Sequence, residues 1–304
     1  MFDMKRDTPV LQPGDEVALI APASYMRNGS EWMIDRAVQI LESWRLNVHV
    51  RCDTNQKKFY LAGDDTYRCN ELKSVLEDKN IKAIFGTRGG YGSARLLPLL
   101  LTNINISEKF FIGFSDLTTL LLALEGRENG IHGIHGPHLA TDQFLSDTTE
   151  GKSNRDRLHA ILFSLEPPPA EKIDVICNGH AIAPMTGGCL SVVVTLLGTP
   201  FEPDFAGKIV FLEDVGEKPF RIDRMLTHLK MAGKFENVRG VVFGEMRACH
   251  DAANDLKEVI RDILSFGNFP VAFGMKAGHG KSNHPFRMGQ IATLDAENRT
   301  VSFS

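Results

Sequence analysis

Ser115 stands where an apolar run changes into a helix-like pattern. Residues 109–114 read Lys-Phe-Phe-Ile-Gly-Phe, which is typical of a buried strand, and residues 117–124 are mostly apolar at helical spacing. A serine at such a junction lifts its hydroxyl above the edge of the sheet, while the first free N–H groups of the helix face whatever the serine attacks. The pattern is therefore typical of an acyl-transfer nucleophile. The alternative is that Ser115 or Asp116 only caps the helix, as serine and aspartate commonly do.

Two later stretches could supply the partners that a serine nucleophile needs. Residues 209–212 are an apolar, strand-like run that leads into Glu213, which puts a carboxylate at the carboxyl end of a strand. His279 lies between two glycines in a loop that we expect to be exposed, so its imidazole could reach across to Ser115. Serine is a weak nucleophile at neutral pH, and it needs a base to take its proton and an anion to orient that base. The residue types therefore predict a nucleophile, a general base and an orienting acid.

The order of these residues along the chain is that of the α/β-hydrolases, but the local motif differs. The nucleophile turn of those enzymes reads G-x-S-x-G, and Leu117 stands where its second glycine belongs. The standard hydrolase fold is therefore disfavoured. Asp214 and Glu217 are rivals of Glu213 for the role of the acid, and Glu213 is preferred because it comes directly off the apolar strand.

Strand-like and helix-like patterns alternate along the first half of the chain. This alternation predicts a mostly parallel sheet with helices on its faces. The expected strands are residues 16–24, 46–50, 81–85 and 109–114, and the expected helices are residues 30–44 and 64–76 and an apolar stretch that ends at Leu101. Ligands of such sheets bind at the carboxyl ends of the strands, which is where Ser115 would lie.

A glycine-rich turn, residues 86–95, is expected near Ser115. It reads Gly-Thr-Arg-Gly-Gly-Tyr-Gly-Ser-Ala-Arg, which lacks the Gly-Lys-Ser/Thr of a phosphate loop and does not fit G-x-G-x-x-G. Its glycines would let the backbone approach a ligand closely, with N–H groups that face the serine. The alternative is a tight turn with no further role.

Three histidines, His132, His135 and His138, follow one another at intervals of three. A metal site is one interpretation of this spacing. The glycines and the proline between them interrupt any helix that would put the three rings on one face, and no carboxylate lies among them. We therefore expect a wall made of strand and loop, and we expect neither a metal nor a cofactor.

The second half begins after a polar segment that ends in three consecutive prolines. Three prolines block both a helix and the interior of a sheet, so this is the best domain boundary in the chain. The sequence predicts an N-terminal domain over residues 1–140, a linker over 141–171 and a C-terminal domain over 172–304 that carries the acid and the histidine. The expected fold class is α/β: a mostly parallel N-terminal α/β sandwich domain and a smaller C-terminal α/β domain, with the active site between them.

The second half repeats the alternation less clearly. Besides the run that leads into Glu213, the expected strands are residues 172–177, 239–243 and 270–273, and the expected helices are residues 220–231 and 256–264. Residues 192–200 are apolar and fit either a helix or a strand by pattern alone.

Length and composition exclude several classes of protein. The chain of 304 residues is 43% hydrophobic and 24% charged, with a formal net charge of −4 and a pI near 6.2, so it reads as an ordinary globular protein. This charge offers no electrostatic basis for nucleic-acid binding, and no apolar run approaches the length of a membrane span. The start lacks the apolar core of a secretory signal and the five scattered cysteines suit reduced thiols. We therefore expect a cytoplasmic protein that acts on a small molecule or peptide.

Several short motifs between Ala18 and Gly289 are informative as a set. They are Arg88-Gly89-Gly90-Tyr91-Gly92, Ile112-Gly113-Phe114-Ser115-Asp116-Leu117-Thr118, His135-Gly136-Pro137, Gly187-Gly188, Leu212-Glu213-Asp214-Val215-Gly216-Glu217, residues 221–226, and Gly278-His279-Gly280 with Asn283. In type and order they resemble the L,D-carboxypeptidase family of serine peptidases. The resemblance implies a nucleophile on the N-terminal domain, an acid and a histidine on the C-terminal domain, and a site between the two.

Specific roles follow from this resemblance. Ser115 would be the nucleophile, His279 the general base and Glu213 the orienting acid. The oxyanion hole would consist of the backbone N–H groups of Gly90 and Asp116. Loss of one such donor commonly costs about 10²–10³ in rate.

The resemblance also implies a class of substrate. Family members remove the terminal D-alanine from cytoplasmic murein tetrapeptides during peptidoglycan recycling, and a related branch cleaves peptidyl-adenylate antibiotics of the microcin C type. That branch relies on an aromatic side chain that stacks on the base, whereas Trp32 and Trp44 both lie in the first expected helix, which favours the murein substrate. Arg88, Tyr91 and Arg221 are candidate substrate-binding residues. A homodimer is expected, with no nucleic acid or membrane as partner.

Two positions depart from the family pattern. Thr186 and Cys189 flank the paired glycines, where relatives often have an aromatic residue and an asparagine. We therefore assign no substrate contact to Thr186 or Cys189. A third hypothesis, besides the two hydrolases, is a catalytically silent protein that binds murein peptides on the same fold, and the intact triad residues argue against it.

Overall fold

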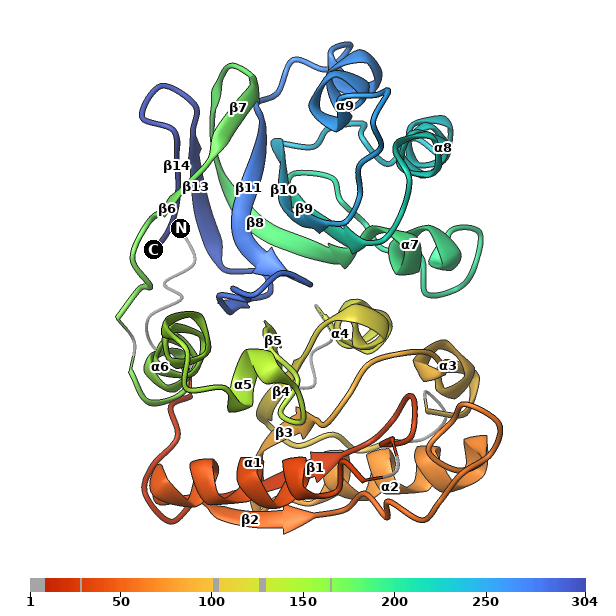
Figure 1. Cartoon of the computed structure of the whole chain (residues 1–304), viewed down its shortest axis with the longest axis vertical. Helices are drawn as coiled ribbons and strands as arrows, with labels where there is room; N and C mark the ends of the chain where they lie inside the picture. Colours follow the sequence, from red (N-terminus) through yellow and green to blue (C-terminus); the bar gives the residue numbers. More distant parts are fainter. Residues whose placement is uncertain (1–8, 28, 101–103, 126–129, 165) are drawn as a thin grey trace.

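The computed structural model describes residues 9–27, 29–100, 104–125, 130–164 and 166–304. Its strands form two sheets, one above the other in Figure 1, and each sheet is covered by helices. The first sheet has the strand order β12-β5-β4-β3-β1-β2, and the second has the order β6-β14-β13-β8-β9-β10-β11-β7. The α/β fold with two sheet-centred halves is thus confirmed.

The first sheet is parallel except for one short strand at its edge. Its strands are β1 (Glu16–Ile20), β2 (Asn47–Val50), β3 (Ile81–Gly86), β4 (Lys109–Gly113), β5 (Ile131–His135) and β12 (Phe286–Arg287). β1 to β5 run parallel, and β12 pairs antiparallel with β5 although it comes from the second half of the chain. All five residues of β4 are buried, as expected for a central strand with both faces covered.

The helices of the first half connect these parallel strands. They are α1 (Trp32–Ser43), α2 (Asp65–Glu77), α3 (Leu97–Leu100) and α4 (Thr118–Leu124), with 3₁₀ turns at Ser93–Leu96 and Ser115–Leu117. The Asp64 side chain caps α2 by accepting a hydrogen bond from the backbone N–H of Tyr67, 2.8 Å away. The apolar stretch expected to end at Leu101 is a 3₁₀ turn followed by α3, and Leu101 itself lies outside the described residues.

Much of the segment between the halves is helical. α5 (Asp142–Leu145) and α6 (Thr149–Phe163) lie within residues 141–171, on the side of the first half that faces the second (Figure 1). Phe144 of α5 and Leu158 of α6 join the same buried cluster as Val17 and Phe110 of the first sheet. The two helices therefore pack on the half that carries Ser115.

The second sheet has a parallel centre and antiparallel edges. Its strands are β6 (Glu171–Lys172), β7 (Asp174–Cys177), β8 (His180–Cys189), β9 (Ile209–Val215), β10 (Gly240–Arg247), β11 (Val271–Gly278), β13 (Ile291–Asp295) and β14 (Thr300–Phe303). β8 to β11 are parallel, while β6, β7, β13 and β14 pair antiparallel. The helices are α7 (Leu190–Val193), α8 (Pro219–Met231) and α9 (Leu256–Leu264), with a 3₁₀ turn at Val194–Leu196.

Some elements of the second half differ from expectation. Residues 192–200, which fitted a helix or a strand, are helical up to Leu196. β11 extends to Gly278, well beyond the expected end at residue 273, so His279 directly follows a strand. The short strands β12, β13 and β14 were not expected, because strands of two to five residues carry little local signal.

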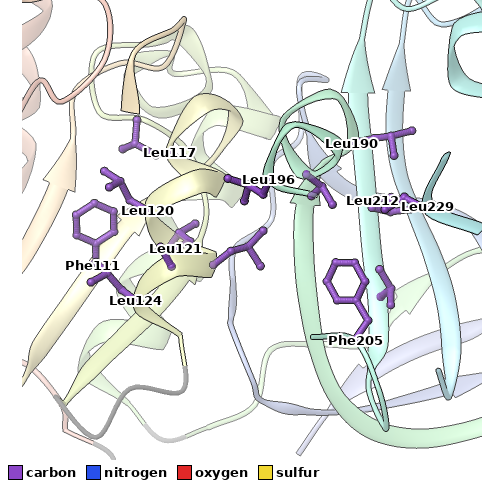
Figure 2. Close-up of a cluster of buried hydrophobic side chains, with 14 of the residues drawn as sticks. Phe111, Leu117, Leu120, Leu121, Leu124, Leu190, Leu196, Phe205, Leu212 and Leu229 are labelled. Atoms are coloured by element: carbon purple, nitrogen blue, oxygen red, sulfur yellow. The ribbon is translucent and has the colours of Figure 1, made fainter. Parts of the chain in front are cut away.

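One buried apolar cluster runs through both halves. Figure 2 shows Leu120 and Leu121 on α4, with Leu196 facing that helix and Leu190 and Leu212 further into the second half. Because this core is continuous, α4 of the first half is held against β8 and α7 of the second by burial of apolar surface. Within the part of the chain that the structure describes, no helix combines the length and the apolar character needed to cross a bilayer.

Candidate active site

Ser115 occupies a sharp turn between β4 and α4. Its φ of +55° lies in the left-handed region that residues other than glycine rarely adopt. A Cβ built on Gly89 would lie 3.1 Å from Ser115 Oγ, and one built on Gly113 would lie 2.7 Å from Leu117 Cδ2. Glycine at these positions therefore leaves room for the turn, which presents the hydroxyl at the carboxyl edge of the first sheet.

A histidine and a glutamate from the second half meet this hydroxyl. His279 Nε2 lies 3.0 Å from Ser115 Oγ, and His279 Nδ1 lies 2.7 Å from Glu213 Oε2. The backbone N–H of His279 donates to the same carboxylate oxygen at 3.1 Å. The structure thus brings together Ser115, His279 and Glu213, although the serine and the histidine are 164 residues apart. An imidazole in this position can accept a proton from the hydroxyl while the carboxylate fixes its tautomer.

Local backbone features set the position of Glu213. Gly278 has a φ of +117°, and a Cβ there would collide with the Glu213 carboxylate, so a glycine is required for the carboxylate to lie against the backbone at His279. Asp214 instead accepts hydrogen bonds from the N–H groups of Ser191 at 2.7 Å and of its own neighbour Val215 at 2.8 Å. The acid that contacts the imidazole is Glu213.

Burial and charge act in opposite directions on the imidazole. The side chain of His279 is 17% exposed and that of Glu213 is fully buried. Burial lowers the pKa of His279, but the hydrogen bond and the charge of Glu213 outweigh burial, so the pKa is raised above its ordinary value. Burial has the opposite effect on the acid: it raises the pKa of Glu213, and the hydrogen bonds from His279 oppose this shift. The charge of Glu213 therefore favours the protonated form of the imidazole more than burial disfavours it.

The glycine-rich turn lies against Ser115 and is held by polar side chains. Asp116 Oδ2 accepts a hydrogen bond from the N–H of Ser93 at 2.8 Å, which ties the turn to the residue after the nucleophile position. The buried guanidinium of Arg68 donates to the carbonyl of Gly92 at 2.9 Å and also to the carbonyl of Pro22. Arg68 was missed from the sequence, although its spacing from Leu72 puts it on the buried face of α2.

Comparison with known proteins agrees with this geometry. Residues 17–136 match the family model described as the LD-carboxypeptidase N-terminal domain, and residues 183–294 match the one described as the LD-carboxypeptidase C-terminal domain. The chain belongs to the LD-carboxypeptidase family. It is therefore a serine-type carboxypeptidase, a hydrolase.

Relatives of this LD-carboxypeptidase align over nearly its whole length. A putative carboxypeptidase of Synechocystis sp. is 34% identical, covering 96% of this chain and 95% of the relative. A probable murein peptide carboxypeptidase of Bacillus subtilis is 30% identical, covering 99% of this chain and 95% of the relative. The structure of the microcin C7 self immunity protein MccF superposes with a TM-score of 0.86 at 20% identity, covering 97% of both chains, which shows a shared fold.

The predicted substrate-binding residues of the carboxypeptidase lie in different settings. Arg88 is half-buried, and its guanidinium donates to the Tyr25 carbonyl at 3.4 Å. Tyr91 is 49% exposed and packs edge-on against Tyr60, with ring centroids 5.5 Å apart. Arg221 is 57% exposed on α8 and pairs with Glu217 at 3.5 Å.

The three histidines form a wall of strand and loop, as expected. His132 and His135 lie in β5, and His138 lies in the loop that follows. The Phe114 ring is 4.5 Å from the His138 ring and 4.9 Å from the His279 ring, centroid to centroid. Burial lowers the pKa of His135 and of His138 to about 3, so both are neutral at neutral pH. Among the residues that the structure describes, no three or more His, Cys, Asp or Glu side chains are grouped to hold a metal ion.

A second cluster of serine, histidine and glutamate lies elsewhere in the molecule. Ser153 Oγ is 3.2 Å from His284 Nε2, and His284 Nδ1 is 2.6 Å from Glu171 Oε1. Arg157 Nη1 lies 2.8 Å from the same carboxylate oxygen. No local sequence pattern indicates this cluster, because its residues come from a helix interior, an edge strand and a loop.

Proposed function

We propose that Ser115, His279 and Glu213 form the catalytic triad of this carboxypeptidase. The proposal rests on one observation: the hydroxyl, the imidazole and the buried carboxylate follow one another at 3.0 and 2.7 Å. His279 takes the proton of Ser115 as the hydroxyl attacks the scissile carbonyl, and then gives it to the leaving amine. Glu213 holds the imidazole and stabilises the imidazolium that forms.

The tetrahedral intermediate needs donors for its negative oxygen. We assign this role to the backbone N–H groups of Gly90 and Asp116. Asp116 follows the nucleophile at the start of a helical turn, where N–H groups lack intrahelical partners, and the glycine-rich turn passes beside Ser115 at Gly89. The bond from Ser93 to Asp116 supports this arrangement because it keeps the two donors at a fixed separation.

The substrate we propose is a murein tetrapeptide, from which the enzyme releases the terminal D-alanine. A Bacillus subtilis relative is named as a probable murein peptide carboxypeptidase, and a Pseudomonas aeruginosa relative as a murein tetrapeptide carboxypeptidase. Arg88 supports the specificity for a chain end. Its guanidinium is half-buried, pairs with no carboxylate among the described residues, and is two residues from Gly90, so it suits the terminal carboxylate of a peptide.

The biological setting follows as part of the same proposal. The five cysteines are all free, which suits a reducing compartment, and we infer a cytoplasmic role in peptidoglycan recycling. The division into residues 1–140, 141–171 and 172–304 and the homodimer are proposed as well, the homodimer from the family resemblance alone. Arg221 is the weaker candidate for substrate binding, because it is exposed and already paired with Glu217.

The alternative is hydrolysis of peptidyl-adenylates in self-immunity. It is favoured by the fold shared with MccF, whose structures include complexes with aspartyl sulfamoyl adenosine and glutamyl sulfamoyl guanosine. Trp44 argues against it, because its ring packs edge-on against Phe144 and Phe163 in the first half instead of facing a ligand. Trp32 is exposed on α1, in the same half.

Release of D-alanine separates these hypotheses. The purified protein is incubated with murein tetrapeptide and, separately, with an aminoacyl-adenylate analogue that carries a cleavable amide. We expect D-alanine from the tetrapeptide and slower turnover of the adenylate. Cleavage of the adenylate alone would favour the immunity function, and tetrapeptide binding without any release would favour a silent binding protein.

A further inference from the structure

The loop that carries His279 is held by a side chain from the opposite half. The amide nitrogen of Gln143 donates to the carbonyls of Gly278 and Gly280, each at 2.7 Å. These two carbonyls flank His279 on either side. Gln143 therefore fixes the backbone at both neighbours of the imidazole, and both of its N–H hydrogens are used.

Two buried asparagines extend this contact into a network. The Asn154 amide donates to the Gln143 carbonyl at 2.9 Å and to the Lys281 carbonyl at 3.1 Å, while its oxygen accepts from the N–H of Asn283 at 2.8 Å. The Asn283 oxygen accepts from the N–H of Gly278 at 2.9 Å, and its amide donates to Gln143 Oε1 at 3.3 Å. Both asparagines are fully buried, so these bonds are shielded from competition by water.

The network crosses between the two halves at the active site. Gln143 lies on α5 and Asn154 on α6, helices that pack on the first sheet (Figure 1). His279 follows β11 of the second sheet. Ser115 and His279 therefore belong to different sheets, and the amides tie the loop of the base to the half that carries the serine.

The chemistry of the network selects a carboxamide at position 143. A carboxamide offers two N–H donors and an acceptor oxygen, and all three are used here. A glutamate of the same shape would place one carboxylate oxygen against the two backbone carbonyl oxygens and would repel both. An alanine would leave the carbonyls of Gly278 and Gly280 without this donor.

We propose that Gln143, with Asn154 and Asn283, is the positioning residue that sets the imidazole of His279 between Ser115 and Glu213. This inference rests on the proposed triad. Its role is not to touch substrate but to keep the base within hydrogen-bond reach of the hydroxyl. An error of about 1 Å in such a placement can cost about 10²-fold in rate.

Steady-state kinetics of Gln143→Glu and Gln143→Ala test the proposal on the peptide that the wild-type enzyme hydrolyses. We expect kcat to fall by about 10²-fold for Gln143→Glu and about tenfold for Gln143→Ala, with KM close to wild type, because alignment and not binding is lost. Asn283→Ala should lower kcat similarly. The double variant Gln143→Ala/Asn283→Ala should fall short of the product of the single effects, because both side chains act on one loop.

The matched control is Gln39→Glu, the same change on the exposed face of α1, where Gln39 Oε1 accepts from Arg36 Nη1 at 3.4 Å and a carboxylate can still do so. It should leave kcat and KM unchanged. A folded Gln143→Ala or Gln143→Glu variant with wild-type kcat would overturn the proposal. So would a rise in KM as large as the fall in kcat, together with additive effects in the double variant.

A readout that does not need turnover separates this proposal from the proposed function. In the Ser115→Ala background, the low-field proton NMR signal of His279 Nδ1–H reports its bond to Glu213. Adding Gln143→Glu should shift or broaden that signal, whereas adding Gln39→Glu should not. An unchanged signal would refute the positioning role even if murein tetrapeptide were not the substrate, and a changed signal would support it.

Discussion

The molecule contains the same three residue types at hydrogen-bond distance in two places. In one, Ser115, His279 and Glu213 follow one another at 3.0 and 2.7 Å, and in the other, Ser153, His284 and Glu171 do so at 3.2 and 2.6 Å. Side-chain distances alone do not distinguish them. The two clusters are distinguished by the backbone around each serine and by the groups that contact each glutamate.

The serines differ in what surrounds the hydroxyl. Ser115 has a φ of +55° at a strand-to-helix turn, with Gly89 beside its Oγ, whereas Ser153 lies inside α6, where neighbouring N–H groups are used by the helix. The glutamates differ too, because Glu171 pairs with Arg157, whereas Glu213 Oε2 accepts hydrogen bonds from the backbone N–H and the imidazole of His279. We infer that a cluster of serine, histidine and glutamate needs the strained turn at the serine, with backbone N–H groups free to bind an oxyanion, in order to be catalytic. The second cluster lacks this turn, and we infer that its role is structural.

The largest expected effect comes from removing the first hydroxyl. Ser115→Ala should lower kcat by roughly 10⁴-fold or more, because the nucleophile is gone and only binding and the oxyanion donors remain. D-alanine release under single-turnover conditions measures this, and binding of the peptide by calorimetry should stay nearly intact. Wild-type turnover in this variant would remove the distinction between the two serines.

Glu213→Gln tests whether the buried acid orients the base. The amide keeps the shape of the carboxylate but is neutral, so it no longer offers an anion to the two N–H groups of His279. It also permits the wrong tautomer of the His279 imidazole. We expect kcat to fall by roughly 10³–10⁴-fold. The measurement is kcat in a variant whose circular dichroism matches wild type, and a fall of less than tenfold would contradict the assigned role.

The pH dependence of the wild-type enzyme is a sharper test of the same pair. His279 must be neutral to accept a proton, and Glu213 raises its pKa, so kcat/KM should rise with pH through a value above about 6.5. Stability has the opposite sign: the contribution of the ion pair is present below the unfolded pKa and is lost as pH rises through the folded pKa. Asp214, Arg247, His135 and His138 also act on this imidazole, so the profile is measured with and without Glu213→Gln, which should move the limb to lower pH.

Glu171→Gln should affect the free energy of unfolding more than the chemistry. It breaks the ion pair with Arg157 at a site where the carboxylate is 5% exposed and the guanidinium 19%. We expect a loss of about 2 kcal/mol, less than for a fully buried pair because the guanidinium reaches solvent. Urea unfolding measures the loss. The kcat value should stay close to wild type, and a collapse comparable to that of Glu213→Gln would mean that the second cluster takes part in catalysis.

The smallest effect is expected for Ser153→Ala. The variant loses one hydrogen bond to His284 and gains helix propensity in α6, so the free energy of unfolding should change by no more than about 0.5 kcal/mol. Activity should be unchanged. D-alanine release is compared directly with that of Ser115→Ala, and a strong loss here would show that geometry at the side chains is sufficient after all.

The sequence was informative where local pattern and chemistry coincide. The apolar run of β4, the turn at Ser115 and the acid that ends the apolar run of β9 each combine a periodic pattern with one reactive residue. Gln143 on α5 and Asn154 on α6 could not be found this way, because a single amide side chain in a helix has no local signature. The importance of Gln143 comes from Gly278 and Gly280, and that of Asn154 from Lys281 and Asn283, all more than a hundred residues away.

The same reason explains the missed strands and the second cluster. β12 has two residues, and the dipeptide Phe286-Arg287 contains no pattern that predicts pairing with a strand in the other half of the chain. His284 gains its meaning only from Glu171 and Ser153, brought to it by the fold. Tertiary contacts of this kind are set by global packing, which no window of the sequence contains.

The pairing of β12 with β5 has a consequence for how the protein is made. The ribosome releases β1 to β5 long before Phe286-Arg287, so the hydrogen-bonding groups at the edge of β5 stay uncovered until β12 has emerged. His279 arrives in the same late stretch. With the proposed triad, the nascent protein cannot hydrolyse amide bonds before this stretch has emerged, and β12 covers the open edge of β5 at the same stage of synthesis.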